Sequence, residues 1–215
     1  MKMKIIQLSV GKPKNLMYTS KKYVSGISKD SIPEAYLAKD CFNGDGVANP
    51  EFHGGEERAV CFYPFEHYAM WEEEFKTSLR IPAFGENLTI EGMMESDVFI
   101  GDIYQIGEAV IQITQGRIPC STISKHNHED RFLKRVFETG YTGYFGKVLK
   151  EGMIRQDSEI ILIDRHPLEI SILEANQTLF HDFKNEERIH NILNVNELAE
   201  AWKLQLNKKL DSLKS

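Results

Sequence analysis

The stretch Gln112–Cys120, Q-I-T-Q-G-R-I-P-C, marks the point where a predicted strand gives way to a predicted helix. The overlapping run Glu108–Thr114 is rich in β-branched residues and therefore favours a strand. Pro119 suits the first turn of a helix, because its fixed φ matches the helix and its missing N–H is not needed there. We therefore predict that Cys120 lies in the first helical turn, beside free backbone N–H groups.

The expected surroundings of Cys120 favour its thiolate form over the thiol. The positive end of the helix dipole lies beside it, and Arg117 places a full positive charge three residues away. A thiolate is the form that attacks electrophiles and binds soft metals. The alternative is a small apolar residue that only closes a strand-to-helix turn, and the residues alone leave both interpretations open.

The composition is that of an ordinary globular protein without a strong charge bias. Of 215 residues, 41% are hydrophobic and 27% are charged, which supplies enough apolar material for a real core. The net charge of −6 gives no overall attraction to nucleic acid or to anionic membranes. We therefore expect neither kind of partner, and an anionic ligand would need a local basic pocket.

The N-terminus and the cysteines indicate a cytoplasmic location. The apolar run within Met1–Val10 is short and is broken by Gln7, so neither a signal peptide nor a membrane span is expected. The three cysteines, Cys41, Cys61 and Cys120, are an odd number at wide spacings. This pattern indicates no disulfide framework and favours a reducing compartment.

Short strands dominate the chain up to about residue 165. A helix is expected from Pro64 to about Lys76, and Asn127 is placed to cap another. The expected strands lie at Met3–Val10, Tyr23–Ser28, Ala35–Phe42, Ala59–Phe62, within Ile81–Gly92, at Val98–Ile106 and Glu108–Thr114, from Gly140–Gly146 toward Leu149, and at Glu159–Asp164. Many short strands with glycine-rich turns favour a β-barrel over a βαβ sheet.

The pattern becomes helical after Arg165-His166-Pro167. Helices are expected at Ser171–Phe180 and Asn185–Leu193, and Asn194 with Glu197 resembles a capping box for a last helix. We therefore predict a mainly β domain over residues 1–165 and a three-helix extension over 166–215. The extension carries six basic and eight acidic side chains, so it lacks the excess of positive charge that DNA binding requires. We therefore expect it to dock on the barrel or on a partner.

The end of the long glycine-rich loop, Asn43–Gly55, is a candidate anion site. Adjacent Gly54 and Gly55 would let the backbone approach a ligand, and their N–H groups could form a nest. His53 and Arg58 would add donors suited to phosphate. The alternative is a tight turn that carries a surface histidine.

A second candidate is the stretch Phe84–Leu88, F-G-E-N-L. Asn87 can offer paired donors and acceptors to a heterocycle, and Glu86 could take or give a proton, a task that His53 or water could also perform. The alternative is a β-turn that leads into a strand.

Four segments, taken in order, resemble the MOSC family, which is named for the C-terminal domain of molybdenum-cofactor sulfurase. They are Gly44–Val60 (G-D-G-V-A-N-P-E-F-H-G-G-E-E-R-A-V), Tyr63–Tyr68 (Y-P-F-E-H-Y), Phe84–Gly92 (F-G-E-N-L-T-I-E-G) and Gly101–Cys120, which ends in R-I-P-C. The helical tail resembles the three-α-helix extension of the bacterial YiiM-like subgroup. One position departs from the family pattern Q-P-R-x-P-C, because Gly116 replaces the first proline and stiffens the turn less.

The resemblance implies a MOSC-type β-barrel that binds molybdenum cofactor (molybdopterin) and reduces N-hydroxylated compounds, such as N-hydroxylated bases. It implies that Cys120 is the molybdenum ligand and, with Arg117, a catalytic residue. The cofactor-binding positions that we assign by hypothesis are His53, Gly54, Gly55 and Arg58 for the phosphate, Arg117 for the thiolate or cofactor, and Asn87 for the pterin or substrate.

The partners and the competing functions follow from the same residues. The chain shows no iron–sulfur cysteine pattern and no flavin motif, so we expect the electrons to come from a separate donor protein. The oligomeric state is open, and a homodimer is one option. Two other functions stay open: a sulfur carrier with a persulfide on Cys120, and a cofactor-binding protein without turnover.

Overall fold

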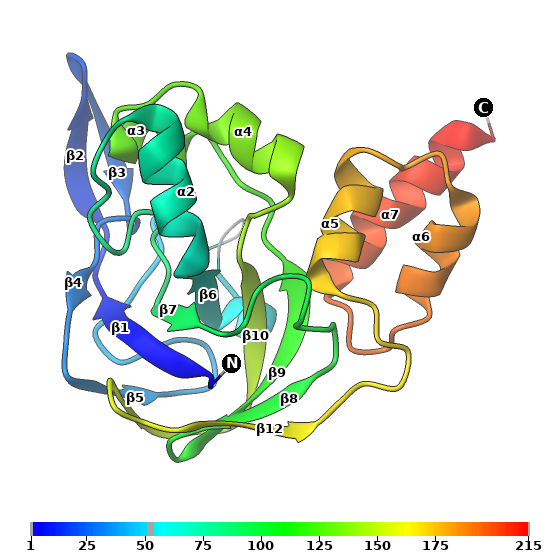
Figure 1. Ribbon diagram of the computed structural model, residues 1–215, viewed down its shortest axis with the longest axis horizontal. Helices are drawn as coiled ribbons and strands as arrows, with labels where there is room; N and C mark the ends of the chain where they lie inside the picture. The colour runs from blue at the N-terminus through cyan, green and yellow to red at the C-terminus, as the bar shows by residue number, and fades with distance from the viewer. Residues whose placement is uncertain (1, 51–53, 215) are drawn as a thin grey trace.

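The computed structural model describes residues 2–50 and 54–214 (Figure 1). The first three quarters of the chain form a curled, eight-stranded half-barrel with a few helices, and the rest forms a group of three helices beside it. The predicted fold class, a barrel-like sheet with a three-helix extension, is therefore confirmed. No helix in the described ranges is long and apolar enough to span a bilayer.

The half-barrel has the strand order β12-β8-β9-β10-β6-β7-β1-β4, and every neighbouring pair is antiparallel except β6 and β7. Its strands are β1 (Lys4–Val10), β4 (Asp30–Ser31), β6 (Val60–Pro64), β7 (Leu88–Glu91), β8 (Ile103–Ile106), β9 (Ala109–Gly116), β10 (Tyr144–Lys150) and β12 (Ile160–Asp164). Strand β9 lies between β8 and β10, and all its residues except Val110 are buried. The stretch that ends in Cys120 therefore leaves the sheet from a fully supported strand.

Two further strand pairs lie outside this sheet. They are β2 (Lys14–Tyr18) with β3 (Lys21–Ser25), and β5 (Glu34–Leu37) with β11 (Gly152–Arg155). Strands β2 and β11 were not predicted. Both strands are short and partly exposed. They therefore lack the run of apolar residues from which a strand is predicted.

Strand β8 is shorter than the predicted Val98–Ile106, because its first half is a turn. Gly101 has a φ of 93°, which leaves the extended region. The Asp102 carboxylate accepts hydrogen bonds from Phe99 N (3.2 Å), Tyr104 Oη (3.2 Å) and His166 N (3.0 Å). These bonds hold the turn closed and tie it to the chain that leads to the helical extension.

The helices are α2 (Glu66–Phe75), α3 (Thr122–Asn127), α4 (Phe132–Thr139), α5 (Ile172–Phe180), α6 (Glu186–Leu193) and α7 (Glu200–Leu213), with a short 3₁₀ turn η1 (Glu56–Arg58). Two predicted caps are wrong. Asn127 is the last residue of α3 rather than the cap of α4, and Asn194 ends α6 rather than starting α7. The Glu57 carboxylate takes the place of a local cap, since it accepts from Glu200 N at 3.1 and 3.2 Å.

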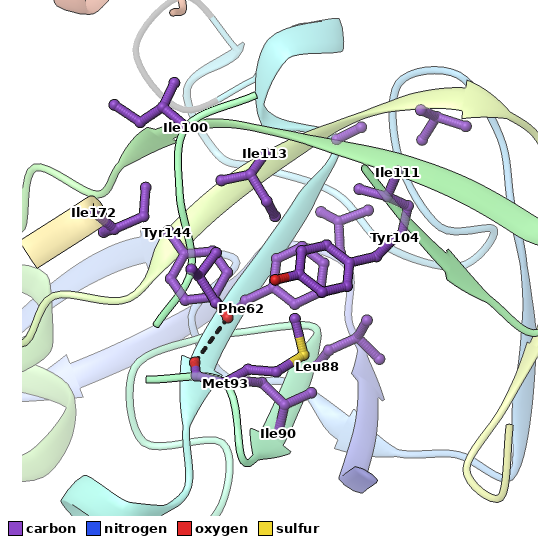
Figure 2. Packing of buried hydrophobic residues seen from close by; sticks show 14 of the residues in the cluster. Phe62, Leu88, Ile90, Met93, Ile100, Tyr104, Ile111, Ile113, Tyr144 and Ile172 are labelled. Atoms are coloured by element: carbon purple, nitrogen blue, oxygen red, sulfur yellow. Dashed lines mark hydrogen bonds between the residues drawn. The ribbon is translucent and has the colours of Figure 1, made fainter. Parts of the chain in front are cut away.

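The main core joins the half-barrel and the helical extension. Figure 2 shows Phe62, Tyr144 and Ile113 of the sheet packed with Ile172 at the start of α5, and Tyr144 Oη donates to Met93 O at 2.9 Å. Trp202 and Leu206 of α7 are fully buried in the same cluster. The extension therefore docks on the barrel through shared apolar burial, which is the dominant stabilising term in such contacts.

Candidate functional site

A pocket of about 890 Å³ opens between the half-barrel and helix α7. Its walls come from the end of β3, the loop after β5, η1, the start of β6, the loop before β7, the loop after β9, and α7. The volume lies in the range of small-molecule and cofactor sites. A smaller hollow of about 400 Å³, beside α2, contains none of the predicted site residues.

The structure brings most of the predicted site residues to this pocket. Those that line it are Gly54, Gly55, Arg58, Asn87, Arg117 and Cys120. They come from three segments that are far apart in the sequence. His53 lies outside the described residues.

Cys120 lies in the loop between β9 and α3, and its side chain is half-buried. Helix α3 begins at Thr122, so Cys120 precedes the first helical turn in which it was predicted. Its carbonyl oxygen accepts from Ile123 N at 3.2 Å, which fixes the loop onto the helix start. The thiol is thus presented to the pocket by a short, anchored loop.

Arg117 makes its contacts away from Cys120. Its guanidinium donates to Phe84 O and lies 4.0 Å from Cys61 Sγ, while its backbone N–H donates to Gly143 O at 3.0 Å. The contacts of this cation therefore fall on a different cysteine from the predicted one. Its role in this structure is to fasten the loop before Cys120 to two neighbouring segments.

All three cysteines line the same pocket, which their wide sequence spacing did not indicate. Burial raises the pKa of Cys61 to about 11, although nearby Arg117 partly offsets the effect. Burial, together with nearby Asp40 and Asp45, also raises the pKa of Cys41. Burial therefore disfavours the thiolate form of these two side chains, and Cys120 is the third thiol that lines the pocket.

Three buried side chains form what we call the pocket floor: Lys29, Asp45 and Asn87. Asp45 forms an ion pair with Lys29 and accepts from Gly11 N (2.9 Å) and Asn87 Nδ2 (2.7 Å). Sequence analysis missed Asp45 and Lys29. The only available signal was the position of Asp45 inside the G-D-G run, and nothing pointed to its partner.

Asn87 uses its amide within the protein. Its Nδ2 also donates to Ser9 O (3.2 Å), and its Oδ1 accepts from Cys61 N (3.1 Å). Both of its N–H donors are therefore engaged, since an amide nitrogen has only two. The predicted contact from Asn87 donors to a pterin does not fit this arrangement, and Asn87 instead holds the strands that form the floor.

Glu86 is sealed away from the pocket. It is fully buried and accepts from Tyr68 Oη (2.5 Å), Thr89 Oγ1 (2.8 Å) and Phe84 N (3.1 Å). Burial raises the pKa of this carboxyl, partly against the effect of these donors. Its carboxylate contacts lie in the core and not in the pocket, so the structure does not support Glu86 as the proton donor.

The loop around Gly54 and Gly55 is partly as predicted. Gly54 N donates to Pro50 O at 3.0 Å, so this amide is not part of an anion nest. Gly55 has a φ of 101°, which favours glycine, and a Cβ there would meet no atom within 4 Å. Among the two glycines, Gly55 is thus the one with open space over its backbone, next to Arg58 on η1.

The described lining residues give the pocket a local positive charge. Its cations are Lys12, Lys29, Arg58, Arg117 and Lys208, whereas its acids are Asp40 and Asp45. The chain as a whole is acidic, with a net charge of −6. A basic pocket on an acidic protein indicates an anionic ligand.

Two family models match separate parts of the chain. A family model described as MOSC domain matches residues 49–161, and one described as YiiM-like, 3-alpha helix domain matches residues 170–213. The Bacillus subtilis (strain 168) protein YflK is 40% identical over 97% of this chain and 95% of its own. Protein YiiM of Escherichia coli (strain K12) is 33% identical over 86% of this chain and 84% of its own.

A fungal relative and two solved structures extend the comparison. A protein named reductase from Gibberella moniliformis is 34% identical over 72% of this chain, which spans 27% of that longer protein. The crystal structure of YiiM from Geobacillus stearothermophilus superposes with a TM-score of 0.83, at 31% identity over 97% of this chain and 99% of that one. YiiM from Escherichia coli gives a TM-score of 0.77, at 27% identity over 99% and 94% of the two chains.

Proposed function

Because this chain belongs to the MOSC domain family and carries a YiiM-like three-α-helix domain, we propose that it is an oxidoreductase that binds molybdenum cofactor and reduces N-hydroxylated compounds. The observation that carries the proposal is the convergence of a half-exposed thiol, Cys120, with a basic pocket of cofactor size. The sequence relation to a protein named reductase supports the oxidoreductase class.

The residues of the pocket fit the proposed cofactor. Molybdopterin has a soft metal, a phosphate and a heterocycle, and the pocket offers a thiol for the metal and cations for the phosphate.

The roles of this chain's side chains follow from their contacts. Cys120 would hold molybdenum, and Arg58 with the backbone at Gly55 would bind the phosphate. Arg117 holds the loop before Cys120 through Phe84 O and Gly143 O, which keeps the thiol in place. When bound, molybdenum cofactor supplies a centre that exchanges two electrons with a substrate.

The proposed reaction converts an N–OH group into N–H and water, and it consumes two electrons and two protons. A separate protein would supply the electrons. Water at the open pocket mouth, or His53, would supply the protons, because Glu86 is buried away from the pocket and Asp45 is already paired with Lys29.

A second candidate is a sulfur carrier, in which Cys120 holds a persulfide. Its half-exposed side chain, on a loop at the pocket edge, is accessible to a sulfur donor and acceptor. In that case the protein would bind no molybdenum during its cycle.

One preparation separates the two candidates. The protein is produced in a host that makes molybdenum cofactor, and molybdenum, pterin and intact mass are measured. Near-stoichiometric metal and pterin, with reduction of an N-hydroxylated base by an artificial electron donor, support the oxidoreductase. Absence of both metal and pterin, with the mass of one extra sulfur on the peptide that contains Cys120, would replace it with the carrier.

A further inference from the structure

Helix α7 has two faces with different surroundings. Trp202, Leu206 and Leu210 are buried in the core. The opposite side consists of Ala201, Leu204, Gln205 and Lys208, which all line the pocket of Cys120 and which we call the α7 wall. Spacings of three, four and seven residues place these side chains on one face of the helix.

Helix α7, which carries the α7 wall, is held firmly against the strand that leads to Cys120. Ala199 N, at the start of the helix, donates to Thr114 O of β9 at 3.1 Å. A side chain at Gly116 would overlap Asn176 Oδ1 of α5 and would come within 3.1 Å of Trp202 Cζ2. Glycine at this position therefore lets the helical unit pack directly on β9, one residue before Arg117.

Four exposed aliphatic side chains surround the same pocket, and we call them the apolar rim. They are Val24, Val47, Ile118 and Leu204, from four separate segments. Leu204 is 61% exposed, more than any other large hydrophobic side chain in the described structure. Convergence of exposed apolar groups on one cavity indicates a ligand with an apolar face, such as an aromatic ring.

Lys208 differs from the other pocket cations in its contacts. Lys29 is paired with Asp45, Lys12 Nζ donates to Asp45 O at 2.6 Å, and Arg117 donates to Phe84 O. The Lys208 side chain takes part in no hydrogen bond or ion pair among the described residues. Gln205 lies three residues before it on the same face, so a cation and an amide donor stand side by side.

We propose that the α7 wall is part of the ligand site and that Lys208, with Gln205, binds a phosphate group of the ligand while Leu204 contacts its ring. The proposal rests on the proposed function for the identity of that ligand. Two ligands share this chemistry: molybdopterin, whose phosphate Lys208 would bind together with Arg58 and the Gly55 backbone, and an N-hydroxylated base in its phosphorylated, nucleotide form. The three-helix extension would then act as the wall that selects the ligand.

The test compares Lys208→Ala with Lys203→Ala. Lys203 lies on the same helix and its loss removes the same charge, but it pairs with Glu200 and does not line the pocket. Molybdenum and pterin per chain are measured in each variant. The dissociation constants of an N-hydroxylated purine nucleoside and of its monophosphate are measured by calorimetry in parallel, and Lys208→Arg tests whether a cation restores the effect.

Two results would support the proposal. If Lys208 binds the cofactor phosphate, Lys208→Ala loses most of its pterin and molybdenum while Lys203→Ala keeps both. If it binds the substrate phosphate, Lys208→Ala keeps the cofactor but binds the monophosphate about tenfold or more weakly, since charge-assisted hydrogen bonds are worth at least that much, and binds the nucleoside as before.

The proposal is overturned if Lys208→Ala matches Lys203→Ala in both measurements. The phosphate-site proposal can be tested even if the wild-type protein contains no molybdenum and the proposed function fails. In that case, preferential binding of the monophosphate that disappears in Lys208→Ala still supports a phosphate site, whereas equal binding of the two probes by the wild-type protein rules it out.

Discussion

The pocket floor and the α7 wall face the same cavity but differ in how their polar groups are used. In the floor, Asp45 and Asn87 are bonded to each other and to the surrounding backbone. On the wall, the side chains of Gln205 and Lys208 have no hydrogen bond or ion pair within the described structure, and Leu204 is largely exposed. A buried polar group without a hydrogen-bond partner destabilises the fold, whereas an exposed one can bond to water and later to a ligand.

This difference shows that proximity to a pocket does not make a polar residue a ligand contact. Two of the three floor residues, Asp45 and Asn87, come from segments that carry the family resemblance, yet their hydrogen bonds hold the surrounding loops together. Cys120 and the side chains of the α7 wall are not engaged in this way. Four substitutions test this distinction, from the largest expected effect to the smallest.

The largest effect is expected for Asp45→Ala in the floor. The change leaves the Lys29 ammonium buried without its partner, which should lower the free energy of unfolding by about 3–5 kcal/mol. Urea denaturation measures the loss. The control is Asp30→Ala, because Asp30 pairs with Lys14 at 2.7 Å on the surface, where such a pair is worth about 0–1 kcal/mol. Equal costs for the two variants would contradict a structural floor.

Gly116→Ala tests the joint between β9 and the helical unit. The added methyl group would overlap Asn176 Oδ1, so we expect a loss of about 2 kcal/mol in the free energy of unfolding. The same substitution should cost less in an Asn176→Ala background, because the obstructing atom is then gone. Additive effects in this double-mutant cycle would argue against direct contact.

Glu86→Gln tests whether Glu86 belongs to the site or to the core. Burial raises the pKa of Glu86 above its ordinary value of 4.5, so its contribution to stability is full below that pH and is lost as pH rises through the folded-state pKa. The variant should therefore gain stability relative to the wild type as pH increases above about 4.5. Exposed Glu73→Gln is the control, and a pH-independent difference for Glu86→Gln would contradict the prediction.

The smallest effect on stability is expected for Leu204→Ala on the α7 wall. Because this side chain is mostly exposed, the free energy of unfolding should change by no more than about 0.5 kcal/mol. Leu206→Ala, two residues later and fully buried, should cost about 2–5 kcal/mol. Thermal or urea unfolding of the two variants checks this, and similar costs would show that Leu204 is a core residue.

The sequence predicts local features well and long-range contacts poorly. Periodicity located β1, β9 and the start of α5 at Ser171, since these depend on neighbouring residues. The cap of α7 was mispredicted because its partner, Glu57, is 143 residues away. In the site, R-x-P-C pointed to Cys120 by resemblance, but no local pattern could show that Cys41 and Cys61 reach the same pocket.

The helical extension illustrates the same limit. Its apolar stripe predicts an amphipathic helix, and Trp202 and Leu206 are buried as such a stripe requires. The apolar stripe does not predict which part of the molecule lies next to the opposite face of the helix. Only the folded chain places Leu204 and Lys208 over a pocket whose other walls come from residues more than fifty positions earlier.

The most direct test of the central claim compares molybdenum per chain in three cysteine variants, Cys41→Ser, Cys61→Ala and Cys120→Ser, produced with molybdenum cofactor. All three thiols line the pocket, burial raises the pKa of Cys41 and of Cys61, and the proposed function assigns the metal to Cys120. The account predicts near-wild-type metal in the Cys41 and Cys61 variants and almost none in Cys120→Ser. Full metal content in Cys120→Ser would contradict it.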